Sequence, residues 1–157
     1  MYNKIDPIAT IVASFPIPEL TKFGNTNQEP TYNTLLQVQK ELNTNSASVE
    51  TTHGTGLHGL LVLTMANTDF LAMTANIPHP PPNHPGVLAP DATAAAARTY
   101  DLNTFHYQQF HSTDKAMKKL ILAACPDLYL SALKKSHDRI LLHHHSTNAH
   151  TPLGLLR

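Results

Sequence analysis

Histidine is the most frequent side chain here that could bind a metal or transfer a proton, with eleven in 157 residues. A zinc site on a helix needs two ligands three or four residues apart. His106 and His111 are five apart, which places them on different helix faces. The tract 143–145 with His150 could hold a metal ion opportunistically, but a polar joint explains it more simply. We therefore predict no metal site.

The other reactive residues give no catalytic arrangement either. His53 and His58 flank glycines, which is typical of a turn or cap. The single cysteine, Cys125, lies at the end of a Leu/Ala-rich segment and is expected to be a small buried hydrophobe. The HGTG sequence at 53–56 lacks the Lys-Ser/Thr of a phosphate loop, and the acidic residues are scattered singly. We predict no enzyme, no cofactor and no small-molecule substrate.

Composition favours a folded, uncharged domain. Eleven Lys+Arg balance eleven Asp+Glu, 41% of residues are apolar and only 14% are charged. This excludes a disordered tail and gives no basic field for non-specific nucleic-acid binding. The lysines at 115, 118 and 119 and at 134–135 are interpreted as solvated helix faces. No run approaches the ~20 apolar residues of a membrane span, and we expect a cytoplasmic protein without a membrane partner.

The pattern of apolar residues and prolines predicts an all-α fold made of two helical halves. Residues 1–30, which contain Pro7, Pro16 and Pro18, are expected to form an extended arm before a helical domain at 31–157. A helix is predicted over 32–48. Six prolines in 77–90 then predict an extended, exposed connector between the halves.

For the remaining segments the sequence leaves alternatives open. Periodicity does not decide between a strand and a helix for 57–65. We favour a helix because no second strand is evident. Asn67 or Thr68 could cap a further helical turn after this segment. Asp91 is expected to cap a helix that begins with an Ala-rich run and either restarts near 112–114 or continues through it. Pro126 suits the first turn of another helix.

The apolar positions of these helices define an expected set of core or assembly residues. They are Leu35, Val38, Leu42, Leu60, Leu61, Leu63, Met117, Leu120, Ile121, Tyr129 and Leu133.

Five short motifs occur in order along the chain. They are ELNTNSASV at 41–49, HGTGLHGLLVL at 53–63, NIPHPPPNHPG at 76–86, DATAAA at 91–96, and TDKAMKKLILAA at 113–124 with LYLSALK after it at 128–134. This series resembles the front of Gag-like proteins from copia-type LTR retrotransposons, most nearly the branch common in protists and algae. The resemblance covers about 31–157, with Leu60 where the family usually has a histidine.

The resemblance implies an all-α capsid domain, truncated at its C-terminus, that works as a structural protein. Such proteins self-assemble into intracellular virus-like particles, so the expected partner is a second copy of this chain, with element RNA as a weaker expectation. Assembly needs only modest contacts that are repeated many times. The alternative is a monomeric, Gag-derived helical adaptor that binds a protein through an apolar groove or the Pro-rich arm at 78–90.

Overall fold

Five helical segments make up the computed structural model, which describes residues 6–24, 29–53, 56–127 and 129–131. They are α1 (Pro7–Ser14), α2 (Tyr32–Ala47), the short 3-10 helix η1 (Leu61–Leu63), α3 (Asn67–Met73) and α4 (Ala94–Ala124). No β-strand occurs within these ranges. The all-α prediction is confirmed for this part of the chain.

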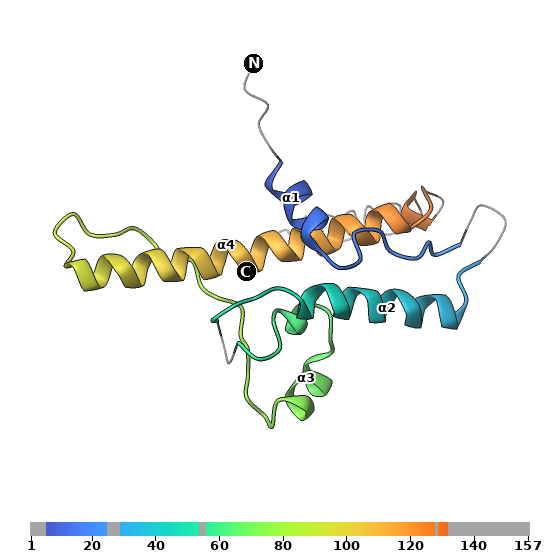
Figure 1. Cartoon of the computed structure of the whole chain (residues 1–157), viewed down its shortest axis with the longest axis horizontal. Coiled ribbons are helices and arrows are strands. Elements are labelled where there is room, and N and C mark those ends of the chain that lie inside the picture. The colour runs from blue at the N-terminus through green and yellow to red at the C-terminus, as the bar shows by residue number, and fades with distance from the viewer. Residues whose placement is uncertain (1–5, 25–28, 54–55, 128, 132–157) are drawn as a thin grey trace, which may run out of the picture.

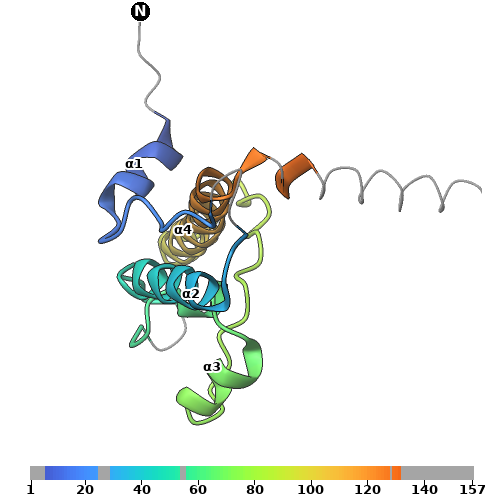
Figure 2. The same cartoon turned by 90° about the vertical axis from the view of Figure 1, so that its right-hand side faces the viewer.

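The long helix α4 lies at the centre of the fold, and the other helices are arranged around it. Figures 1 and 2 show α1 and α2 lying along different sides of its C-terminal half, with α3 beyond α2. The buried core fills the space between them and consists of Phe15, Leu20, Val38, Ala116, Met117, Leu120 and Ala124. The N-terminal half of α4 extends past the other helices (Figure 1). The loop that leads into it runs beside it, and the loop after α2 reaches it at His106 and Gln109.

Both long helices begin at a threonine that satisfies a free backbone N–H. Thr31 accepts a hydrogen bond from the Thr34 amide at the start of α2, close to the predicted boundary. Thr93 does the same for the Ala96 amide at the start of α4. The prediction of Asp91 as the cap is therefore wrong by two residues. α4 then runs unbroken through 112–114, so it does not restart there.

The expected extended arm contains a helix, α1, and that expectation is wrong over residues 7–14. Pro7 lies in the first turn, where no backbone N–H is needed, and the Asp6 carboxylate accepts from the Ile8 amide at 3.0 Å. The helix ends before Pro16. The prolines therefore mark the two ends of a helix here.

Residues 57–65 form neither a strand nor a full helix. They contain a turn and the single 3-10 turn η1. The cap predictions for Asn67 and Thr68 are also wrong, because Ala66 occupies the cap position of α3 and makes no side-chain bond.

The segment 15–23 is an extended strap that ties α2 to the C-terminal end of α4. Asn45 of α2 accepts a hydrogen bond from the Ile17 amide at 2.9 Å and donates one to the Ile17 carbonyl at 2.7 Å. The Glu41 carboxylate accepts from both the amide and the hydroxyl of Thr21 at 2.7 Å. The Phe23 amide donates to the Ala124 carbonyl at 3.1 Å. Buried side chains of α2 thus replace a second strand as the partner of this backbone.

Replacing Glu41 with glutamine is expected to cost about 1–3 kcal/mol of unfolding free energy at pH 7, because a neutral amide replaces the carboxylate that accepts charge-assisted hydrogen bonds from Thr21 and Gln37. Burial raises the pKa of Glu41, but hydrogen bonds from Thr21 and Gln37 outweigh it and hold the pKa below its ordinary value. This stabilisation is complete above the unfolded-state pKa and is lost as pH falls through the folded-state pKa.

Denaturant unfolding at pH 7 and at successively lower pH measures both effects. The exposed Glu19→Gln is the control and should change stability by less than about 0.5 kcal/mol. An acid-induced loss in Glu41→Gln as large as in the unaltered chain would contradict the assignment to this carboxylate.

Candidate functional site

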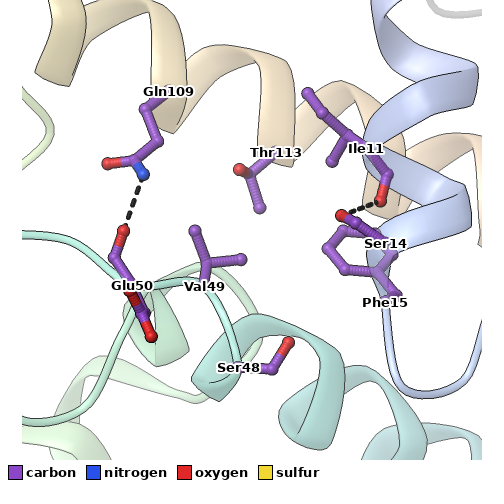
Figure 3. A pocket seen from close by; sticks show the side chains of 8 residues that line it. All are labelled: Ile11, Ser14, Phe15, Ser48, Val49, Glu50, Gln109 and Thr113. Carbon is purple, nitrogen blue, oxygen red and sulfur yellow. Dashed lines mark hydrogen bonds between the residues drawn. The ribbon is translucent and has the colours of Figure 1, made fainter.

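A cavity of about 370 Å³ lies where α1, the segment after α2 and α4 meet. Its lining residues are Ile11, Ser14, Phe15, Ser48, Val49, Glu50, Gln109 and Thr113 (Figure 3). Several of the polar groups are already engaged: the Gln109 amide nitrogen donates to the Glu50 carbonyl at 2.8 Å, and the Ser14 hydroxyl donates to the Ile11 carbonyl at 2.7 Å. Glu50 is the one carboxylate of the lining, so the cavity lacks a carboxylate pair for acid–base chemistry.

Three histidines that are far apart in the sequence come together where the loop after α2, the Pro-rich connector and α4 meet. His53 belongs to that loop, His79 to the Pro-rich connector and His106 to α4. The ring of His53 lies 4.7 Å from that of His79 and 5.4 Å from that of His106, centre to centre. A smaller hollow of about 190 Å³ beside them is lined by His53, Pro82, Asn83, Asn103 and His106.

Each of these rings has a different environment. The Nε2 atom of His53 lies 2.9 Å from the Pro80 carbonyl, and that of His106 lies 2.8 Å from the Thr52 hydroxyl. The Nε2 atom of His79 is buried and has no partner within the described residues. Burial lowers the pKa of both His79 and His106, and the nearby His53 lowers each of them further. The surroundings of His79 and His106 therefore favour the neutral form of these two imidazoles.

This cluster was not predicted from the sequence, where His53 was interpreted as a turn residue, His106 was weighed only against His111, and His79 was not singled out. Within the part of the chain that the structure describes, no group of three His, Cys, Asp or Glu side chains is placed to hold a metal ion. The tract at 143–145, His150 and the lysines at 134–135 lie outside the described residues.

The structure separates the expected core or assembly residues into two groups. Most are shielded from solvent: Val38, Leu60, Leu61, Met117 and Leu120 are buried, and Leu42, Leu63 and Tyr129 are half-buried. Leu35 is 47% exposed because it lies in the first turn of α2, before the helix reaches the core. Ile121 is 36% exposed because it lies at the edge of the α4 stripe formed by Met117, Leu120 and Ala124. Leu133 lies outside the described residues.

The N-terminal half of α4, called the free half below, carries two exposed apolar side chains that were not singled out from the sequence. Leu102 is 50% exposed and Phe105 is 54% exposed. They are three residues apart and thus lie on neighbouring positions of one helix face. Between Ala94 and Phe110 the charged residues are Arg98 and Asp101, so this stretch has no net charge.

The lysines and the cysteine behave as ordinary structural residues. Lys118 pairs with Asp114 at 2.7 Å, and Lys119 with Asp6 at 3.2 Å; all four are at least partly exposed. Cys125 is half-buried directly after α4. Within the ranges described, no helix has the combination of length and apolar character required to cross a membrane.

Comparisons of the chain with protein-family models, with curated proteins and with solved structures return no match.

Proposed function

We propose that this chain is a Gag-like capsid structural protein that self-associates through its helices into intracellular particles. The proposal rests on the ordered motif series from 41 to 134 and its likeness to copia-type retrotransposon Gag proteins. The observation that supports it best is the N-terminal half of α4, which extends past the other helices (Figure 1). Its side chains Leu102 and Phe105 are exposed to solvent.

A second copy of the chain is the occupant that this surface suits best. A neutral helix face does not repel its own copy. Fully burying a Leu or Phe side chain contributes about 1.5–3 kcal/mol, so two half-exposed side chains on each copy supply a modest contact. Contacts of that size are sufficient in particles because each copy repeats them.

The motif at 41–49 and the segment that contains the motif at 53–63 contact each other in the fold. The Leu60 amide donates to the Ser46 carbonyl at 2.9 Å, and the Ser46 hydroxyl lies 2.7 Å from that of Thr64. The Asn/Ser-rich helix end and the segment after the Gly-rich joint are therefore hydrogen-bonded to each other. RNA is a weaker proposed partner, because a net charge of zero gives little attraction to phosphate.

Light scattering on a sizing column over a wide concentration range tests the proposal, with electron microscopy of the heaviest fraction. We expect the mass to rise with concentration and particles or defined oligomers to appear. A folded monomer at every concentration would contradict self-association and favour the monomeric adaptor.

A further inference from the structure

The three clustered histidines connect three separate parts of the fold. His53 donates to the Pro80 carbonyl, since a carbonyl oxygen can only accept, and so it holds the connector directly. Its ring also contacts those of His79 and His106. We propose that these histidines form an acid-sensitive latch, which holds the first part of the Pro-rich connector against α4 when the rings are neutral and releases it when they are protonated.

Protonation would disrupt the cluster because positive charges would accumulate at short range. Rings whose centres lie 4.7 and 5.4 Å apart repel strongly once two of them are charged. Within the described residues, no carboxylate forms a hydrogen bond or ion pair with any of the three. A proton on Nε2 of His79 would moreover create a buried N–H without an acceptor.

The surroundings of His79 contain little that could offset this repulsion. On the side of α3 the ring faces Phe70 at 6.1 Å, and His58 lies against that same phenyl ring at 6.5 Å. The other titratable or charged side chains of the neighbouring elements are exposed or belong to other contacts. They are Glu50 in the loop, Asp69 on α3, His84 on the connector and, on α4, Arg98, Tyr100, Asp101, Tyr107 and His111. The Tyr100 hydroxyl bonds the Gly86 carbonyl, and the rings of Tyr107 and His111 contact each other. The charged residues of α4 from Asp114 onward lie eight or more residues along the helix from His106.

The direction of the pH effect follows from the lowered pKa of His79 and His106. Both groups bind a proton less readily in the folded state than at the ordinary pKa of 6.5. Their contribution to stability is therefore fully present above about pH 6.5 and declines as the pH falls below that value. The latch would respond to mild acidification.

Release would be confined to one end of the connector. Its later part is attached to α4 independently, by the Tyr100 hydroxyl that donates to the Gly86 carbonyl at 3.3 Å and by the contact between the rings of His84 and Tyr107. Residues 77–82 are therefore the segment that should move away.

Distances between two spin labels test this release. The labels are placed at the exposed positions Pro81→Cys and Gln108→Cys in a Cys125→Ala background, at a protein concentration where the chain is monomeric. We expect a narrow distance distribution at pH 7.5 that becomes broader and longer at pH 5.5. In His79→Phe, which keeps an aromatic ring and removes one titrating group, only the His53–His106 pair can still repel. The distribution at pH 5.5 should therefore be clearly narrower than in the unaltered chain at the same pH.

The matched control is His84→Phe, which removes a histidine outside the cluster and keeps an aromatic ring against Tyr107; it should respond to acid as the unaltered chain does. Circular dichroism melts provide a second readout: the fall in Tm from pH 7.5 to 5.5 should shrink by at least half in His79→Phe. If His79→Phe does not fold, His106→Gln, which can still bond Thr52, takes its place. An acid-independent distance in the unaltered chain, or an equal Tm loss in all variants, would overturn the latch.

Discussion

Replacing Gly59 with alanine is expected to destabilise the fold by about 2–5 kcal/mol, the sum of two separate penalties. Gly59 has φ +54°, a conformation that costs an L-residue about 1–2 kcal/mol. An added Cβ would also lie 2.5 Å from the Ala47 carbonyl oxygen and 2.8 Å from that of Ser46. Both atoms are backbone at the end of α2, so relief requires the joint to move, at a cost of about 1–3 kcal/mol.

Gly86→Ala separates the two penalties. Gly86 also has a positive φ, +79°, but an added Cβ would meet nothing within 4 Å. It should lose about 1–2 kcal/mol, from the backbone conformation alone. Denaturant unfolding of both variants measures the difference. Equal losses would show that the close approach of Gly59 to α2 does not limit stability.

Replacing Leu120 with alanine is expected to cost about 2–5 kcal/mol. Leu120 is buried in the core formed by α4, α2 and the strap, where it packs with residues such as Phe15 and Val38. Removing its side chain leaves a cavity that surrounding helices can close only in part. Thermal or denaturant unfolding gives the value.

Leu122→Ala is the matched control, because Leu122 lies on the same helix but is exposed. It should change stability by less than about 0.5 kcal/mol. A loss below about 0.5 kcal/mol in Leu120→Ala as well would mean that this face of α4 does not form the core.

The two long helices could be predicted because their signals are local. Apolar residues at helical spacing define α2, and an Ala-rich run indicates the start of α4, although its cap was expected at Asp91 and lies at Thr93. The buried face of α4 followed from the positions of Met117 and Leu120. Its edge did not, because Ile121 satisfies the same spacing and yet lies at the rim of the core.

The helix α1 was missed because three prolines were weighed as helix breakers. Pro7 is compatible with a first helical turn, and Asp6 directly before it was a visible capping signal. The other features depend on contacts between distant segments. Asn45 and Glu41 are polar, so the spacing of apolar residues does not mark them as buried, yet they bind the strap 28 and 20 residues away in the sequence.

The histidine cluster could not be predicted for the same reason. His53, His79 and His106 are separated by more than twenty residues at each step, and only the path of the Pro-rich connector brings them together. Sequence spacing relates only residues on one helix. It therefore excluded a zinc site formed by His106 and His111, but it carries no information about partners from other elements.

Self-association through the free half of α4 is tested most directly by light scattering on a sizing column with two apolar-to-acidic variants. Phe105→Glu places a charge on the proposed contact, whereas Val87→Glu alters an apolar residue of the connector that is more exposed than Phe105, at 96% against 54%. Because both side chains are exposed, both variants should fold with an unchanged Tm. We expect Phe105→Glu to weaken association about tenfold or more, and Val87→Glu to assemble like the unaltered chain. Unchanged association of Phe105→Glu would contradict the account.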